Sequence, residues 1–353
     1  MKILAIETSC DETGIALLEA SGKLSNPRFK VLKNLVSSQI KLHQPFGGVV
    51  PNLAKREHLK NLPILFGKIL KQATSDMRHV DLITVTVGPG LEPALWTGIE
   101  FAKKLAEEYK KPLIGANHLE GHLYSFLLPK PGQKKNSDMR HGVTDKAIFP
   151  AIALIVSGGH TNLLKMDSFS KWRCIGETRD DAAGEAFDKV ARMLELPYPG
   201  GPEIEKLAKR GDPTAIPFPR PMLHDKNRDF SFSGLKTAVL YYLRDNPPKP
   251  KTLDPRPNIA ASFQQAAIDV LVIKTMRATQ EYNAKSVILC GGVAANKKLR
   301  SDMRHGTRDK DLTFFVPEFK FNLDNAAMIG AAGYMAYLRR KKYKMKADGT
   351  MGI

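Results

Sequence analysis

The same strand–turn–strand pattern occurs twice in this 353-residue chain. Segments 2–19 (KILAIETSCDETGIALLE) and 151–166 (AIALIVSGGHTNLLKM) each place a polar or glycine-bearing turn between two short apolar runs. Such runs, separated by Asp and Gly, predict β-hairpins. Strand-length runs then alternate with helix-length segments along the chain, which is typical of α/β proteins. We therefore expect an α/β fold with two similar lobes and a cleft between them.

The remaining pattern predicts further elements and a division of the chain. Helices are expected over 51–73, 94–109, 180–194, 230–243, 258–282 and 324–338, and strands over 81–87 and 286–290. The length exceeds the usual size of one core, and the polar, basic stretch 129–146 is the best candidate for a linker or surface loop. The predicted parts are an N-terminal lobe (1–128), this linker, a second lobe (147–323), and a helix with a basic tail (324–353) that returns to the first lobe.

The charge balance is strongly basic, with a formal net charge of +18. Such a surface favours polyanions, nucleic acid first and an anionic membrane second, although general solubility is an alternative reading. The basic tail LRRKKYKMK (338–346) could contact phosphates or could place cations against a helix end. A nucleic-acid partner is therefore expected, without specific contact residues.

The cysteines and apolar runs indicate a cytoplasmic protein without a membrane span. Cys10, Cys174 and Cys290 are odd in number and far apart, so they predict neither a disulfide framework nor a thiolate zinc site. The first residues turn polar after one short apolar run, unlike a signal peptide. No apolar run approaches the roughly 20 residues that a membrane-spanning helix needs.

The pentapeptide SDMRH occurs at 75–79, 137–141 and 301–305. The spacing is irregular, so it is not the period of a repeat protein. We interpret the copies as loop insertions or replacements, and exclude their histidines from the candidate metal ligands.

Four glycine-bearing turns follow predicted elements: GPGLEP (88–93), SGGHT (157–161), YPGGP (198–202) and GGVAAN (291–296). Glycine lets backbone N–H groups approach a phosphate or sugar closely. None of the turns has the dinucleotide-binding or P-loop pattern, and each alone is compatible with ordinary turn chemistry. Four of them in a doubled α/β pattern favour a nucleotide site.

Carboxylates accompany two of these regions. Asp11 and Glu12 lie in the first hairpin turn, and Asp180, Asp181, Glu185 and Asp188 lie in the following helical segment. Carboxylates beside a phosphate site hold a metal or a sugar hydroxyl, whereas helix capping explains Asp180 and Asp181 equally well. Asp188 lies deeper in an apolar helix, which favours a ligand role.

The segment NHLEGH (117–122) places His118 and His122 four residues apart, on one face of a helix. In the zinc-peptidase signature a general-base Glu directly follows the first His, but Leu119 stands there and Glu120 follows at i+2. Two helical residues rotate by about 200°, so Glu120 should point away from a metal. Asp324 is a good candidate for the third ligand, because a carboxylate with two imidazoles suits iron or zinc.

These motifs together resemble the TsaD (Gcp, OSGEP) family in its bacterial form. The resemblance rests on KILAIETSCDETGIALLE, NHLEGH, VSGGHT, DDAAGEAFDKVAR, FSFSGLKTA, CGGVAAN and DNAAMIGAAG, in this order, and covers nearly the whole chain. It implies an actin/Hsp70/sugar-kinase-like fold. It also implies transfer of the threonylcarbamoyl group of threonylcarbamoyl-AMP to N6 of adenosine 37, in the anticodon loop of tRNAs that read ANN codons.

The resemblance also implies site residues and partners. The metal, Fe²⁺ or Zn²⁺, would be bound by His118, His122 and Asp324, and Asp11 and Glu12 would lie near the reacting phosphate as catalytic carboxylates. The adenylate or ATP would be bound by Ile155, Val156, Ser157, Gly158, Gly159, Asp188, Gly201, Glu205 and Asn296. Expected partners are tRNA, a TsaB-like paralogue and a TsaE-like ATPase, with a TsaC-like synthase supplying the adenylate.

Two alternatives stay open on the residues alone. One is a metallopeptidase, disfavoured by Leu119 at the position of the catalytic Glu. The other is a non-enzymatic nucleotide switch of the Hsp70 or actin type, disfavoured by the His pair.

Overall fold

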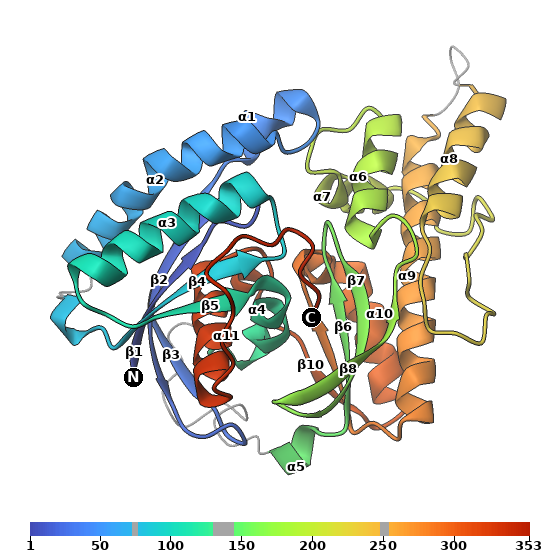
Figure 1. Ribbon diagram of the computed structural model, residues 1–353. Helices are drawn as coiled ribbons and strands as arrows, with labels where there is room; N and C mark the ends of the chain where they lie inside the picture. Colours follow the sequence, from blue (N-terminus) through green and yellow to red (C-terminus); the bar gives the residue numbers. More distant parts are fainter. Residues whose placement is uncertain (73–76, 130–144, 248–253) are drawn as a thin grey trace. The chain divides into compact units, whose positions relative to one another are not determined.

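The computed structural model describes residues 1–72, 77–129, 145–247 and 254–353 (Figure 1). The chain forms two compact units. The first contains 1–147, 168–170 and 317–353, and the second contains 148–167 and 171–316. The second unit therefore begins at residue 148, where the prediction has 147. The chain returns to the first unit at residue 317, seven residues before the predicted position 324. Most of the predicted linker (129–146) lies outside the described residues.

The first unit is built on a five-stranded sheet of order β3-β2-β1-β4-β5. Its strands are β1 (Lys2–Glu7), β2 (Glu12–Ser21), β3 (Arg28–Ser38), β4 (Leu82–Gly88) and β5 (Leu113–Asn117). β1 and β2 form the predicted antiparallel hairpin, and β4 and β5 continue the sheet in parallel with β1. The carboxyl ends of β1, β4 and β5 therefore meet at one edge of the sheet.

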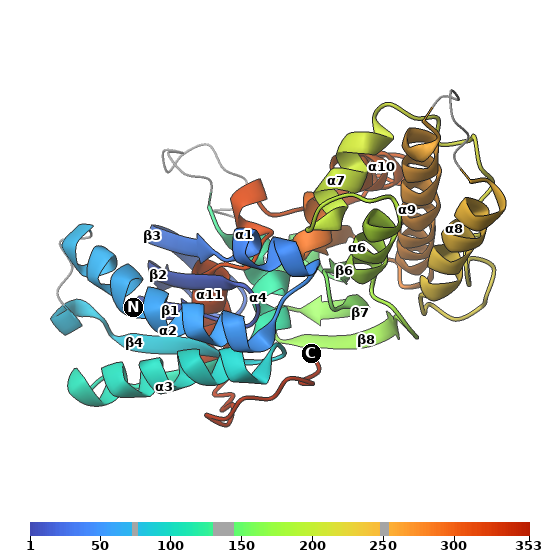
Figure 2. The same ribbon diagram turned by 90° about the horizontal axis from the view of Figure 1, so that it is seen from above.

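Helices cover both faces of this sheet (Figures 1 and 2). α2 (Pro51–Gln72) and α3 (Glu92–Glu108) pack on one face, where leucine and isoleucine side chains form the core. α4 (His118–Tyr124) and α11 (Ala326–Leu338) lie on the other. The short helix α1 (Ile40–His43) follows β3. α11 is built from small residues, which lets α4 and the strands approach it closely.

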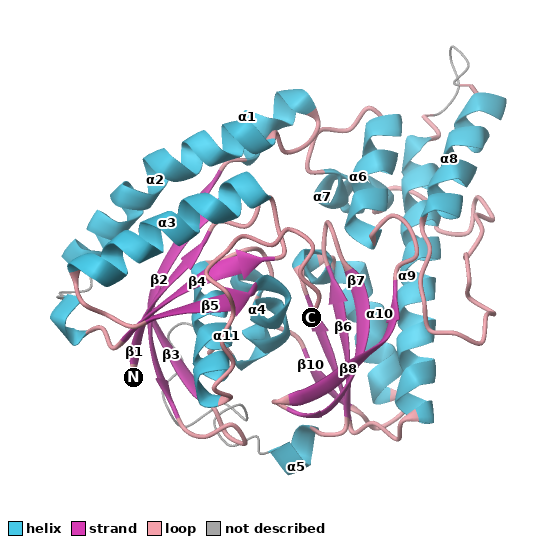
Figure 3. Ribbon diagram, in the orientation of Figure 1, coloured by secondary structure: helices cyan, strands magenta, loops and turns pink. Residues whose placement is uncertain are grey.

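The second unit, whose strands are drawn in magenta in Figure 3, repeats this topology. Its sheet has the order β10-β9-β6-β7-β8, which matches the first when read from the opposite edge. The strands are β6 (Ala151–Val156), β7 (Thr161–Ser168), β8 (Lys171–Glu177), β9 (Ser286–Cys290) and β10 (Thr313–Phe315). β6 and β7 form the second predicted hairpin, and β9 pairs in parallel with β6. The prediction of two similar α/β lobes is confirmed.

The short helix α5 (Asp145–Ile148) lies at the boundary of the two units. The described helices of the second unit are α6 (Ala183–Met193), α7 (Gly200–Ala208), α8 (Ser233–Asp245), α9 (Arg256–Glu281) and α10 (Lys297–Arg308). Among the described residues, α9 is the one helix long and apolar enough to cross a membrane, but 78% of its most apolar window is buried inside the protein. Its composition is therefore that of a core helix.

The SDMRH copies have different structures. The copy at 301–305 lies inside α10, where Met303 is fully buried, so the interpretation as a loop insertion is wrong there. Residues 77–79 form a single 3₁₀ turn, and 137–141 lie outside the described residues. Periodic burial on α10 explains the difference, because Leu299, Met303 and Thr307 recur every four residues on its inner face.

Candidate metal centre

The His pair lies on the short helix α4, directly after β5. Asn117 ends the strand and caps the helix, its side-chain oxygen accepting hydrogen bonds from the backbone N–H groups of Leu119 (2.8 Å) and Glu120 (3.1 Å). An asparagine N-cap satisfies donors that the first turn leaves open. The helix therefore starts at His118, and His122 follows one turn later.

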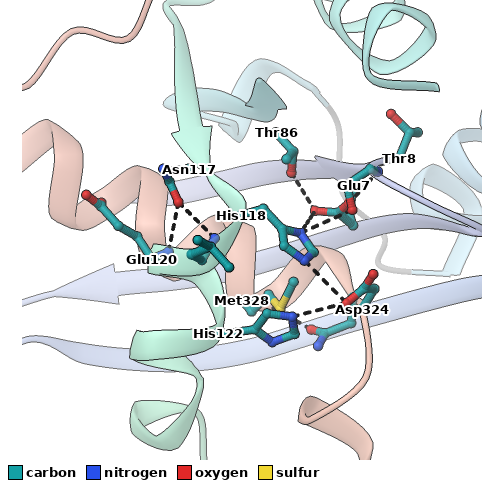
Figure 4. A network of polar contacts seen from close by, with 12 residues as sticks. Glu7, Thr8, Thr86, Asn117, His118, Glu120, His122, Asp324 and Met328 are labelled. Atoms are coloured by element: carbon teal, nitrogen blue, oxygen red, sulfur yellow. Dashed lines mark hydrogen bonds and ion pairs between the residues drawn. The ribbon is translucent and has the colours of Figure 1, made fainter. Parts of the chain in front are cut away.

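Both histidines face Asp324 (Figure 4). Asp324 Oδ1 lies 3.5 Å from His118 Nε2 and 3.2 Å from His122 Nε2. One ligand atom from each of the three residues lies within 4.8 Å of the ligand atoms of the other two. Asn325, rather than Asp324, caps α11 by accepting a hydrogen bond from Met328 N–H at 3.1 Å. The structure thus brings the three predicted metal ligands together.

The donor set fits a divalent cation. His122 is fully buried, and within the described part of the chain neither of its ring nitrogens makes a hydrogen bond, although Nε2 lies 3.2 Å from Asp324 Oδ1. Burial lowers the pKa of His122, so a neutral imidazole with an available lone pair is favoured there. Burial also opposes charge on His118, but Asp324 and Glu7 together raise the pKa of His118 to about 9. A cation held by Nε2 of both rings and by Asp324 would satisfy the buried His122 nitrogen that makes no hydrogen bond with the described residues.

Close packing of α4 on α11 depends on Gly121. A Cβ atom at Gly121 would lie 3.0 Å from Ile329 Cδ1 and 3.1 Å from Met328 Cγ. Glycine therefore lets the two helices approach until the histidines and Asp324 share one site.

A buried carboxylate that the sequence did not single out lies behind His118. Glu7 Oε1 accepts a hydrogen bond from Ser9 N–H (2.6 Å), and Oε2 accepts one from the Thr86 hydroxyl (2.5 Å). Glu7 Oε2 is also 3.4 Å from His118 Nδ1, and Ser9 Oγ is 3.1 Å from the same nitrogen. The signal in the sequence was a charged residue at the end of a buried strand.

Glu120 points away from the metal ligands, as predicted from its i+2 position. Its carboxylate accepts hydrogen bonds from Arg339, from Lys341 Nζ (3.1 Å) and from the Tyr343 hydroxyl (2.7 Å). The backbone carbonyl of Gly352 accepts a hydrogen bond from Asn117 Nδ2 (2.8 Å). Part of the basic tail therefore packs against α4.

Of the predicted catalytic carboxylates, Asp11 lies in the turn between β1 and β2, and Glu12 is the first residue of β2. Asp11 is buried, and Glu12 is partly buried with one oxygen 3.3 Å from Ser38 Oγ. Burial, then the charges of Asp11 and Asp324, raise the pKa of Glu12 well above its usual range. Asp324 belongs to the electrostatic surroundings of Glu12, so the acidic turn lies near the metal ligands.

A buried histidine ties this turn to α2. His58 Nε2 is 3.0 Å from the carbonyl oxygen of Cys10, and its Nδ1 is 2.8 Å from Thr13 Oγ1. This second polar contact was also not predicted, because a single His on an amphipathic helix carries no specific signal.

The predicted adenylate residues all lie in the second unit. Ile155 and Val156 end β6 with fully buried side chains, so only their backbone is available to a ligand. The turn that follows is closed by hydrogen bonds between Ser157 and His160. Cβ atoms at Gly158 and Gly159 would meet nothing within 4 Å. The turn therefore presents open backbone.

The other predicted adenylate residues join neighbouring elements. Asp188 Oδ1 accepts a hydrogen bond from Gly200 N–H (2.7 Å) at the start of α7, beside Gly201, where a Cβ would also meet open space. Asn296 caps α10 and donates a hydrogen bond to Gln264 Oε1 (2.9 Å). Glu205 and Gln264 line a surface pocket of about 400 Å³. Glu205 and Gln264, the hydrogen-bond partner of Asn296, therefore line the same pocket.

Known proteins similar to this chain agree with these motifs. The TsaD family, described as tRNA N6-adenosine threonylcarbamoyltransferase, matches residues 30–331. The enzyme of this name from Moorella thermoacetica is 48% identical over 338 residues, which are 96% of this chain and 92% of that protein. The one from Bacillus subtilis is 42% identical over 354 residues, covering 100% of this chain and 95% of that protein.

Solved structures agree with the fold. HypF of T. kodakarensis has a TM-score of 0.57 at 15% identity and covers 98% of this chain and 49% of that one. Full-length HypF in its phosphate- and nucleotide-bound form has a TM-score of 0.56 at 11% identity, covering 98% and 47%. At these identities the likeness concerns the fold alone, and it confirms the actin/Hsp70/sugar-kinase-like class that the repeated sheets indicate. With a family match over most of its length and relatives nearly half identical, this chain belongs to the TsaD family.

Proposed function

We propose that this protein is a tRNA N6-adenosine threonylcarbamoyltransferase. The observation that carries the proposal is 42–48% identity, over 94–100% of the chain, to relatives of that name. The substrates are threonylcarbamoyl-AMP and adenosine 37 of tRNAs that read ANN codons. The net charge of +18 suits a tRNA substrate.

His118, His122 and Asp324 would hold one divalent metal, with Fe²⁺ or Zn²⁺ suited to two imidazoles and a carboxylate. When bound, a metal there would supply Lewis acidity to a substrate phosphate. Gly121 and the Asn117 cap support this arrangement, because they fix where α4 starts and how closely it packs on α11.

The adenylate would bind in the second unit. The open backbone of Ser157, Gly158 and Gly159 suits phosphate oxygens, and Gly201 and the backbone of Ile155 and Val156 add to this surface. Glu205 would accept a hydrogen bond from a ribose hydroxyl in the pocket that it lines. Asn296 donates a hydrogen bond to Gln264, which lines the same pocket. Asp188 fixes the start of α7 through Gly200.

In the reaction, the exocyclic amine of adenosine attacks the carbamoyl carbon, a C–N bond forms, the C–O bond to phosphate breaks, and AMP leaves. The amine must also lose a proton. Asp11 is the candidate acceptor, and Glu12, whose raised pKa favours its protonated form, could stabilise the leaving phosphate by donating a hydrogen bond. Adenosine in a single-stranded loop is accessible to such an attack.

Partners and setting follow from the same family. We propose that a TsaB-like paralogue and a TsaE-like ATPase assist the protein in the cytoplasm and that a TsaC-like synthase supplies the adenylate. A peptidase is disfavoured by Glu120, whose carboxylate is bound by tail residues rather than directed at the metal ligands. A non-enzymatic nucleotide switch is disfavoured by the His/His/Asp cluster.

The test is reconstitution with purified partners, labelled threonine, bicarbonate and ATP, followed by counting label in ANN-decoding tRNA. Label should appear with wild-type protein and with His79→Ala, which changes an exposed histidine before the amino end of β4. It should be lost with His122→Ala. Absence of label with the wild-type protein, although the synthase makes the adenylate, would reject the proposed function.

A further inference from the structure

Glu7 is a completely buried carboxylate at the end of the central strand β1. Among the described residues, its carboxylate contacts the Thr86 hydroxyl at 2.5 Å and His118 Nδ1 at 3.4 Å (Figure 4). It also accepts a hydrogen bond from Ser9 N–H at 2.6 Å. β1 and β4 are paired neighbours in the sheet, so Glu7 and Thr86 come from a rigid part of the fold. The carboxylate position is therefore fixed independently of the helix that carries His118.

The charge of Glu7 has no permanent counterion. Within the described part of the chain, no Lys or Arg forms an ion pair with Glu7, and His118 is its one ionisable partner. Removing a carboxylate from water costs several kcal/mol, which two neutral hydrogen-bond donors offset only in part. With Asp324 on the other side of His118, two carboxylates flank the imidazoles. A divalent cation at the His118, His122 and Asp324 atoms would balance both charges.

The position of Glu7 also bears on which nitrogen of His118 carries the proton. A histidine that binds a cation through Nε2 must hold its proton on Nδ1, where an acceptor is needed. The Nδ1 atom has Ser9 Oγ at 3.1 Å and Glu7 Oε2 at 3.4 Å. A hydroxyl can donate or accept, whereas a carboxylate only accepts. Glu7 therefore favours the tautomer that leaves Nε2 open toward Asp324.

We propose that Glu7 is a positioning residue of the metal centre, which holds the Nδ1 proton of His118 and supplies the second negative charge that a divalent cation requires. This inference rests on the metal site proposed above. Carboxylates behind metal-bound histidines raise ligand basicity and orient the ring, and their loss lowers metal affinity by about 10- to 100-fold.

The test measures Zn²⁺ binding by competition with a chromophoric chelator, on the full-length protein freed of metal. Glu7→Gln should weaken Zn²⁺ binding by about 10- to 100-fold. The matched control is Glu100→Gln, an exposed carboxylate on α3, which should bind like the wild type. Thr86→Val, which removes one hydrogen bond to Glu7 and keeps its charge, should weaken binding by less. Thermal unfolding of the metal-free variants checks that each is folded.

A second measurement needs no variant. In ¹⁵N-histidine NMR spectra of the Zn²⁺-loaded wild type, His118 should carry its proton on Nδ1 and be metal-bound through Nε2. A proton on Nε2, or Zn²⁺ affinity of a folded Glu7→Gln equal to that of the wild type, overturns the role of Glu7. If the wild type binds no Zn²⁺, or if His122→Ala binds as tightly, the proposed metal site itself fails, which is a different result.

Discussion

The contact between Glu120 and the C-terminal tail gives the sharpest prediction about stability. The Glu120 side chain is 1% exposed and its partner Arg339 is 10% exposed, whereas Lys341 is 44% exposed. Removing one partner of a buried ion pair costs about 3–5 kcal/mol, and an exposed pair contributes at most about 1 kcal/mol. Arg339 keeps a little contact with water, so we expect Glu120→Ala to lower the unfolding free energy by about 3 kcal/mol, at the lower end of that range.

Urea and thermal unfolding measure this loss. About 3 kcal/mol corresponds to a fall of about 6–12 °C in Tm for a unit of this size. Glu100→Ala, at an exposed carboxylate on α3, is the matched control and should change stability by less than about 0.5 kcal/mol.

A double variant separates the ion pair from packing. Adding Arg339→Met to Glu120→Ala should cost less than the sum of the two single changes, with a coupling of about 0.5–3 kcal/mol. If Glu120→Ala unfolds at the same temperature as Glu100→Ala, the tail contact does not stabilise the fold and the reasoning is refuted.

Three further predictions follow from the geometry. Burial lowers the pKa of His58 below its ordinary 6.5, so the stability gained from its neutral form is present above about pH 6.5 and is lost as the pH falls toward the pKa of the folded state. His58→Gln should therefore make the unfolding free energy, measured with urea, depend less on pH in this range. An unchanged pH dependence would contradict the prediction. Gly121→Val should overpack the contact between α4 and α11, lowering the unfolding free energy by about 1–3 kcal/mol and reducing the bound Zn²⁺ found by metal analysis. The control is Gly67→Val, which should keep its metal because a Cβ there would meet no described atom outside its own helix backbone within 4 Å. Asn296→Ala should weaken AMP binding measured by calorimetry and leave Zn²⁺ binding unchanged, because Asn296 contacts Gln264 in the second unit. If the variant binds AMP as tightly as the wild type, Asn296 does not belong to the adenylate site.

The central strands were predictable because their side chains are buried on both faces. β1, β4, β6 and β9 read as continuous apolar runs, which is the pattern of such strands. β3 and β8, at sheet edges, were not predicted as strands. Their sequences, RFKVLKNLVSS and KWRCIGE, mix charged and apolar residues because much of each strand is exposed. Pairing with the neighbouring strand, rather than local composition, decides their structure.

The candidate metal ligands could be predicted to the extent that they share local spacing. His118 and His122 are one helical turn apart, and Asp324 precedes a helix of small residues. Glu7 is far from all three in sequence, and Thr86 is a strand residue whose hydroxyl donates a hydrogen bond to the Glu7 carboxylate. Such contacts depend on sheet pairing and helix packing, which no local pattern contains.

The two buried glutamates near α4 show how the same side chain takes different roles according to its donors. Glu120 has a guanidinium, an ammonium and a phenol around it, so two cationic side chains lie against its carboxylate. Glu7 has a backbone N–H, a hydroxyl and an imidazole, none of which is a permanent cation. A carboxylate with permanent cations joins two segments of the fold. One without them creates a place where an exchangeable cation would be stabilised, and Glu7 lies directly behind His118, a candidate metal ligand. The donors around each carboxylate, more than its burial, therefore distinguish the structural glutamate from the functional one.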